Sequence, residues 1–228
     1  MLGRASDELK RFDLGIKSMK YIIKEIPDCK MNILSTINKD DSLIKLVYEL
    51  KLINYIQFLG YSSIPEIHFK NASLHIFPSI SESFGMVLSE TKIYGIPNIL
   101  IGLDYLSISN GGTIIVYDDN PESVAIEAIK ILSNYTYRKK LGKEARHSMI
   151  KFQNKLILKR WNQLILSIYN GDNYYQILRN KGPKISEKYS KELIKNQINI
   201  LKKRKKIFNN ITLQNLCNFT NMENINYK

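Results

Sequence analysis

Two carboxylates, Glu82 and Glu90, stand eight positions apart around the start of a predicted helix. Glu82 falls in the polar loop before the helix and Glu90 about two turns into it, so at 1.5 Å per residue they are roughly 12 Å apart. Paired carboxylates that act on one bond lie at most about 9.5 Å apart. The spacing therefore indicates that the two carboxylates bind opposite ends of one elongated ligand, which has hydroxyl groups at each end and an anion between them. A nucleoside diphosphate sugar has this layout.

The start of the same helix offers a site for the anion. Backbone N–H groups in the first turn of a helix have no partner within the helix, and together with the helix dipole they attract phosphate. We expect the contacts to come from four consecutive residues, Ser83, Phe84, Gly85 and Met86.

Two basic side chains fit the same interpretation. Arg4 and Lys10 both lie in the first predicted strand-to-helix connection. Arginine offers a planar fork for phosphate oxygens and lysine a mobile point charge. His75, by contrast, lies in an apolar strand, and we interpret it as a hydrogen-bonded buried histidine rather than a catalyst.

Short apolar runs that alternate with helical periods must position these residues. Runs typical of buried parallel strands span residues 31–35, 55–60, 74–78, 98–102 and 113–117. Helical patterns span residues 12–26, 41–52, 85–94, 121–132 and 157–168. The alternation predicts an α/β fold with a doubly wound, Rossmann-like parallel sheet. Such sheets bind ligands at the carboxyl ends of their strands, where the loop that holds Glu82 falls.

Charge and pattern divide the chain into a body and a tail. Residues 1–171 carry a net charge of +5 and residues 172–228 a net charge of +8. We predict a nucleotide-sugar-binding domain over 1–171 and a basic helical tail over 172–228, frayed at its end. Only Met1 and Leu2 precede the first strand exit at Gly3. The sheet therefore begins almost without its first strand, and we expect the chain to be truncated at its N-terminus.

Several segments together resemble the donor-binding, C-terminal half of GT-B glycosyltransferases of family 4. The most specific is the E-x7-E segment at 78–90 with the Gly-x-Pro at 95–97. Weaker matches lie at 3–16, 58–60, 111–113, Asp119 and 141–146.

The resemblance implies a retaining transfer of a hexosyl group from a nucleotide diphosphate sugar, with no metal or other cofactor. Arg4 and Lys10 would bind the diphosphate and stabilise the leaving group, Glu82 would hold the sugar, and Glu90 the ribose. The backbone at 83–86 would contact the sugar and distal phosphate. Family members also have an N-terminal acceptor domain, which this sequence lacks; we therefore expect a separate acceptor-domain chain as a partner and little transfer by this chain alone.

Other classes of function receive less support. Walker A, HExxH, GxSxG and Cys/His metal spacings are absent, and Cys29 and Cys217 are too few for a disulfide framework. We predict a cytoplasmic protein that also contacts an anionic membrane surface through the basic cluster 202–206. Two alternatives stay open: a non-catalytic nucleotide-sugar-binding subunit of a split enzyme, and a membrane- or nucleic-acid-binding protein acting through its tail. Nucleic acid is the less favoured partner.

Overall fold

The computed structural model describes residues 1–37, 42–103 and 106–173. The predicted basic tail, including the cluster 202–206, lies outside the described residues from 174 onward.

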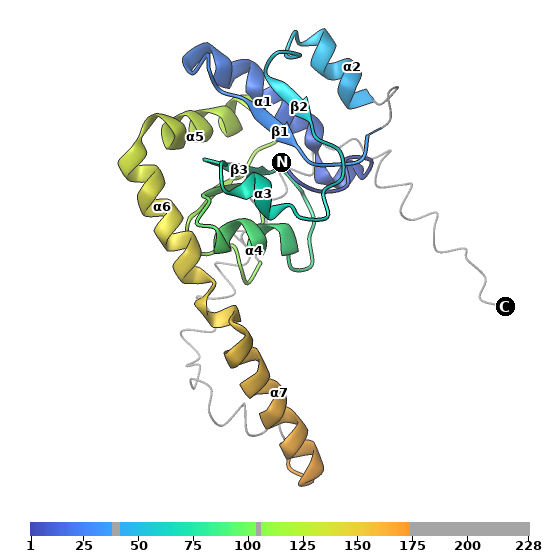
Figure 1. Cartoon of the computed structure of the whole chain (residues 1–228), viewed down its shortest axis with the longest axis vertical. Helices are drawn as coiled ribbons and strands as arrows, with labels where there is room; N and C mark the ends of the chain where they lie inside the picture. Colours follow the sequence, from blue (N-terminus) through green and yellow to red (C-terminus); the bar gives the residue numbers. More distant parts are fainter. Residues whose placement is uncertain (38–41, 104–105, 174–228) are drawn as a thin grey trace, which may run out of the picture.

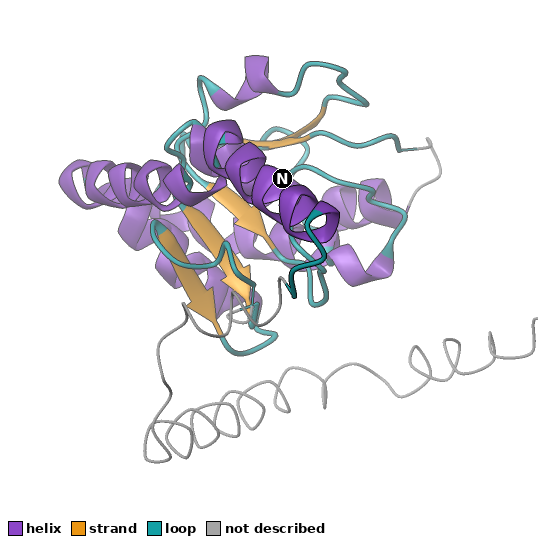
Figure 2. Ribbon diagram, turned by 90° about the horizontal axis from the view of Figure 1, so that it is seen from below, coloured by secondary structure: helices purple, strands orange, loops and turns teal. Residues whose placement is uncertain are grey.

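Five parallel strands form two sheets (Figures 1 and 2). Each predicted strand is confirmed, shortened by one or two residues at its ends: β1 Met31–Ile33, β2 Ile56–Phe58, β3 His75–Phe77, β4 Asn98–Ile101 and β5 Thr113–Val116. One sheet pairs β1 with β2, and the other has the order β3-β4-β5. Helices lie on both sides of the strands, as the α/β prediction requires.

The five predicted helices are also present, and the structure adds two helices and two 3₁₀ turns. In chain order the elements are η1 Glu8–Lys10, α1 Phe12–Glu25, α2 Ser42–Glu49, α3 Glu66–Phe69, α4 Met86–Ile93, α5 Pro121–Ser133, α6 Tyr135–Ser148, η2 Ile150–Phe152 and α7 Asn154–Tyr169. The sequence pattern missed α3 and α6. Helix α6 has no apolar stripe, because it buries only Leu141, Gly142 and Ala145.

Alternate residues of the strands face two separate cores. Ile76, Ile99 and Ile101 pack into a cluster with α1 and α5. Phe77 and Leu100, which directly follow Ile76 and Ile99 in their strands, pack into a second cluster with α4 and the loop after β4. Side chains of successive strand residues point to opposite faces, so this division shows that both faces of the three-stranded sheet are buried.

Two glycines let α6 approach the strand connections closely. A Cβ on Gly142 would lie 2.4 Å from the carbonyl oxygen of Gly95, and one on Gly112 would lie 2.3 Å from that of Leu141. Any side chain at either position would push the backbones apart. Packing of α6 against these connections therefore explains why glycines occur at residues 95, 112 and 142.

Helix α7 runs away from the rest of the molecule (Figure 1). The helix was predicted with one apolar stripe, but most of that stripe is exposed: Trp161 is 57% exposed, Ile165 57% and Ile168 66%. None of the helices in the described ranges is long and apolar enough to cross a bilayer.

The residues before Arg4 pair with the end of β1. Leu2 forms an isolated parallel bridge with Leu34, just beyond β1. Gly3 N–H donates to Leu34 O at 3.2 Å, and Leu34 N–H donates to Met1 O at 3.0 Å. This agrees with the prediction that the first strand exit lies at Gly3.

Candidate functional site

The connection between Gly3 and Arg11 carries Lys10, and local hydrogen bonds fix its shape. The Asp7 carboxylate accepts from Leu9 N–H at 3.0 Å and caps η1. Arg11 ends η1 in the left-handed region, with φ 48°, and α1 starts directly after it. The chain therefore turns sharply at Arg11, and Lys10 is held beside the start of α1.

This connection is hydrogen-bonded to both sheets at the carboxyl ends of their strands. Ala5 N–H donates to Ser35 Oγ at 2.9 Å, just after β1. Ile80 N–H, just after β3, donates to Leu9 O at 3.0 Å. The first connection is thus the segment that joins the β1–β2 pair to the β3–β5 sheet at this edge.

Lys10 and Glu82 meet at this edge, although 72 residues separate them in the sequence. The ammonium of Lys10 donates to Glu82 Oε1 and forms an ion pair. Both side chains are mostly buried, with 19% and 14% of their surfaces exposed. The structure therefore brings together the predicted diphosphate cation and the predicted sugar carboxylate.

Arg11 adds a second link, which the sequence analysis did not single out. Its guanidinium pairs with Asp119 Oδ1 at 2.8 Å, in the connection after β5, and with Asp13 Oδ1 at 3.0 Å. Burial alone would raise the pKa of Asp13, but hydrogen bonds from Arg11 and Lys17 hold that pKa below its ordinary value. The only sequence signal was the position of Arg11 beside Lys10 in one connection.

The loop 78–85 ends at the start of α4, as expected for an anion site. Gly85 occupies the N-cap in the left-handed region, with φ 82°, and has no side chain to cap the helix. Phe84 is anchored by an edge-to-face contact with Phe152, with ring centroids 5.5 Å apart. Ser83 and Met86 are exposed. Since no side chain of the described residues caps α4, its first-turn N–H groups can bind an anion.

The other two predicted site residues, Glu90 and Arg4, have different surroundings from the Lys10–Glu82 pair. Glu90 is half-buried on α4, and burial, with a smaller contribution from Glu66, raises the pKa of its carboxyl group. The side chain of Arg4 is 82% exposed and lies 3.6 Å from the Asp7 carboxylate. Arg4 is thus largely open to solvent, whereas Lys10 is held in its ion pair with Glu82.

Lys92 is a buried cation that sequence reasoning missed. Its ammonium donates to the carbonyl oxygens of Ile108 and Asn110, the latter at 2.8 Å. Burial, and secondarily Lys151, lowers the pKa of Lys92 to about 8. Because Ile108 also packs near Gly85, Lys92 supports the loop behind the α4 start. A single lysine on a helix gives no sequence signal for this role.

Within the described ranges, no three His, Cys, Asp or Glu side chains gather as ligands for a metal ion. The charged groups at the strand exits are instead paired cations and carboxylates. This arrangement can bind an anion flanked by hydroxyl groups.

The sequence matches the family described as "Glycosyl transferases group 1" over residues 1–148. The chain belongs to this family. It is 24% identical over 200 residues to a poly(glycerol-phosphate) alpha-glucosyltransferase of Bacillus subtilis, covering 84% of this chain and 30% of the relative. It is 22% identical to a poly(ribitol-phosphate) alpha-N-acetylglucosaminyltransferase of Staphylococcus aureus, covering 69% and 33%.

Solved glycosyltransferases share the fold. The crystal structure of TarM superimposes with a TM-score of 0.65 at 21% identity, covering 72% of this chain and 34% of that one. A pneumococcal O-GlcNAc transferase, GtfA, solved with UDP and GlcNAc, gives 0.62 at 22% identity, covering 74% and 35%. This group 1 chain therefore has the GT-B-type α/β fold and spans about a third of the length of these relatives.

Proposed function

We propose that this chain binds a nucleotide diphosphate sugar at the carboxyl edge of its strands and supplies the donor half of a retaining hexosyl transfer. One observation carries the proposal: Lys10 and Glu82, from connections 72 residues apart, meet beside the uncapped start of α4. A cation, a carboxylate and free helix N–H groups at one place match the diphosphate and the hydroxyl groups of such a donor.

In this proposal each group has one role. Lys10, Arg4 and the N–H groups at 83–86 hold the diphosphate and stabilise the negative charge that develops on it as the sugar leaves. Glu82 accepts hydrogen bonds from the sugar, and Glu90, farther along α4, accepts them from the ribose. These cations and N–H groups supply the positive charge that a diphosphate needs, so the proposal includes no metal ion or other cofactor.

The relatives narrow the donor class. Their names describe glucosyl and N-acetylglucosaminyl transfer, and the pneumococcal structure was solved with UDP and GlcNAc. We therefore propose UDP-glucose or UDP-N-acetylglucosamine as the donor. The Lys10–Glu82 pair supports a nucleotide diphosphate sugar as the donor. It does not indicate which base the donor carries, because in this proposal the pair binds the phosphates and the sugar.

The proposal assigns binding of the acceptor to residues outside the described α/β body. Helix α7 leaves the described α/β body with an exposed apolar face that includes Trp161, Ile165 and Ile168. Exposed apolar surface of this kind marks an interaction site. We propose that an acceptor-binding chain or domain supplies the rest of the active site, so that the isolated chain binds donor but transfers sugar poorly. The proposed location is the cytoplasm, in part at the cytoplasmic face of an anionic membrane.

Two variants test the assignment of roles. Glu90→Gln should weaken binding of UDP and of the UDP-sugar alike, about tenfold or more, because a hydrogen bond to a charged group contributes roughly 1.5–3 kcal/mol. Glu82→Gln should weaken only the UDP-sugar, because Glu82 faces the sugar. Isothermal titration calorimetry with both ligands measures each affinity.

Glu122→Gln provides the matched control, since Glu122 is exposed in the first turn of α5 and the substitution should leave both affinities unchanged. If Glu82→Gln and Glu90→Gln each weaken UDP and the UDP-sugar equally, the proposed division of roles is wrong.

A further inference from the structure

A groove of about 420 Å³ lies beside helix α6, at the amino ends of β3 and β4. Ala72 and Ser73, which precede β3, line it together with Gly95 and Pro97, which precede β4. The candidate donor site follows the carboxyl ends of parallel strands, so the length of the strands separates the groove from that site. The proposed donor binding therefore makes no use of this groove.

Four cations of α6 line the groove: Arg138, Lys139, Lys143 and Arg146. The last three are four and three residues apart, so they lie along one face of the helix and span about 10 Å of its length. Glu144, the one carboxylate of α6, is not part of the lining. Among the described residues, none of the four cations forms an ion pair with a carboxylate. Their positive charge is therefore available to a ligand.

Backbone carbonyl groups hold both arginines in place. Arg138 donates to Leu132 O at 2.6 Å, near the end of α5, and Arg146 donates to Tyr94 O at 3.3 Å. A guanidinium has five N–H donors, so most of them remain for a ligand, and arginine binds phosphate oxygens through two parallel hydrogen bonds. The two arginines are thus fixed points at the two ends of the row of cations.

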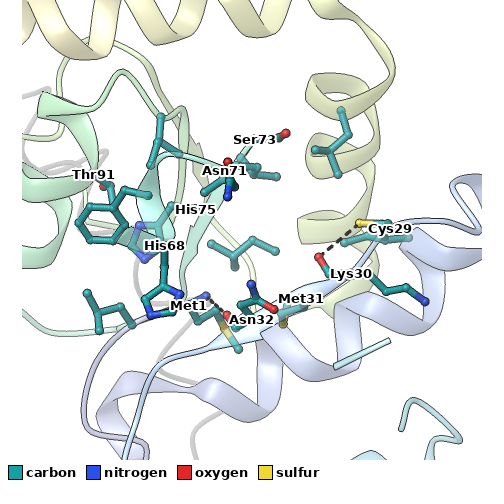
Figure 3. A pocket seen from close by; sticks show the side chains of 18 of the residues that line it. Met1, Cys29, Lys30, Met31, Asn32, His68, Asn71, Ser73, His75 and Thr91 are labelled. Atoms are coloured by element: carbon teal, nitrogen blue, oxygen red, sulfur yellow. Dashed lines mark hydrogen bonds between the residues drawn. The ribbon is translucent and has the colours of Figure 1, made fainter. Parts of the chain in front are cut away.

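The groove adjoins a largely apolar cavity of about 480 Å³ between the two sheets (Figure 3). Met31 and His75, at the starts of β1 and β3, line this cavity, and Ser73 and Arg138 line both spaces. The other three cations of α6 line the groove alone. An anionic ligand therefore belongs in the groove and not in the cavity.

We propose that this groove binds a linear phosphodiester polymer with a polyol backbone, several of whose phosphates contact α6 at once. A row of cations about one helix turn apart matches an anion that is repeated along a chain rather than a single anion. The hydroxyl groups of Ser73 and Tyr94, which also line the groove, can pair with hydroxyl groups of the polyol. This inference is independent of the donor site.

The aromatic side chains of the groove favour such a polymer over nucleic acid. Proteins that bind single-stranded nucleic acid stack its bases on aromatic rings. In this groove Arg138 and Lys139 approach the ring of Tyr135, at 5.6 and 5.7 Å from its centroid, and the ring of Tyr94 packs edge-to-face against Phe69. Cations and a neighbouring ring thus occupy the surfaces on which bases would stack.

Lysine acetylation footprinting of the full chain with lipid-free poly(glycerol phosphate) locates the binding. The polymer should protect Lys139 and Lys143 at least about threefold more than Lys20 and Lys24, an exposed pair with the same spacing on α1. In fluorescence anisotropy, Lys139→Gln with Lys143→Gln should weaken binding of the labelled polymer about tenfold or more. It should also reduce the slope of log K against log salt from about −3 to about −1.5, as expected when two of four phosphate contacts are lost.

The same double change at Lys20 and Lys24 is the matched control and should leave the affinity for the polymer unchanged. Lys10→Met should also leave it unchanged, so that failure of the groove and failure of the donor site are distinguishable. If the control pair is protected equally, or if its loss weakens binding equally, the polymer is attracted only by the net charge of +13 and the proposal is wrong.

Competition identifies the occupant. Unlabelled poly(glycerol phosphate) should displace the labelled polymer at a concentration of charge at least about tenfold lower than inorganic phosphate, oligothymidylate or poly-L-glutamate requires. If inorganic phosphate competes equally well, the groove binds single anions. If oligothymidylate or poly-L-glutamate competes equally well, the groove accepts nucleic acid or acidic peptide. Each of these results overturns the assignment to a polyol phosphate.

Discussion

The two ends of the gap between the sheets differ sharply. At the carboxyl end, the first connection crosses the gap and is held by the Ala5–Ser35 and Leu9–Ile80 hydrogen bonds and the Lys10–Glu82 ion pair. At the amino end, the strands border a cavity of about 480 Å³. Of the two ends of the gap, the end that holds the candidate donor site is thus the one bridged by hydrogen bonds and an ion pair.

This difference explains how a divided sheet can present an ordered site. The site residues come from both sides of the gap, and the contacts among them also hold the two sides together. Substitutions at the carboxyl end should therefore affect stability and ligand binding together, whereas changes at the amino end should affect stability more than binding.

The largest effect is expected when the free energy of unfolding is compared between a substitution in the three-stranded sheet and one in the cavity wall. Ile99→Ala, in fully buried β4, should cost about 2–5 kcal/mol, the usual range for large-to-small changes in a core. Met31→Ala should cost clearly less, because Met31 already borders open space and fewer contacts are lost. Urea unfolding measures both. Equal costs would show that the cavity is filled or collapsed in solution.

A smaller effect is expected for the ion pair that crosses the gap. In a double-mutant cycle of Lys10→Met and Glu82→Gln, the coupling should be about 1–2 kcal/mol, as for contacting residues in a mostly buried pair. The same cycle on Lys130 and Glu127, a pair on α5 at 3.7 Å whose side chains are 60% and 26% exposed, should give no more than about 0.5 kcal/mol. If the effects of Lys10→Met and Glu82→Gln on the free energy of unfolding are additive, the ion pair does not help to hold the two sides of the gap together.

Much of this architecture could be predicted from sequence, and the exceptions have physical causes. Strands and amphipathic helices were predictable because their residues alternate or recur at fixed periods. Helix α6 was not predicted because it packs through small residues such as Gly142 rather than through an apolar stripe. The exposed face of α7 was unpredictable because periodicity shows that a face is apolar but not what covers it.

The candidate site shows the same limit. The E-x7-E spacing indicated Glu82 and Glu90 as candidate site residues, and the first strand-to-helix connection indicated Arg4 and Lys10. The contact of Lys10 with Glu82, the Arg11–Asp119 pair and the support from Lys92 depend on segments far apart in the chain. Only the folded structure defines such contacts.

A pH dependence is expected from His75, which lines the cavity. Burial lowers the pKa of His75 to about 3 from the ordinary 6.5. Between these values the unfolded chain binds a proton that the folded chain does not, so the free energy of unfolding should fall as pH drops, by at most about 1.36 kcal/mol per pH unit from this group. Above pH 6.5 it contributes nothing. His75→Gln should remove this part of the slope in urea titrations from pH 7 to 4; an unchanged slope would mean that water reaches the imidazole.

The central claim, that the carboxyl edge binds a nucleoside diphosphate, is tested most directly by calorimetric titration of the purified chain with UDP, with uridine as the matched ligand lacking phosphates. The account predicts saturable binding of UDP, weak or no binding of uridine, and at least about a tenfold loss in Lys10→Met, which corresponds to about 1.4 kcal/mol. Saturating UDP at 100 times its Kd should also stabilise the fold by about 2.7 kcal/mol. If UDP, GDP and ADP all fail to bind, or if uridine binds as tightly as UDP, the donor-site assignment is wrong.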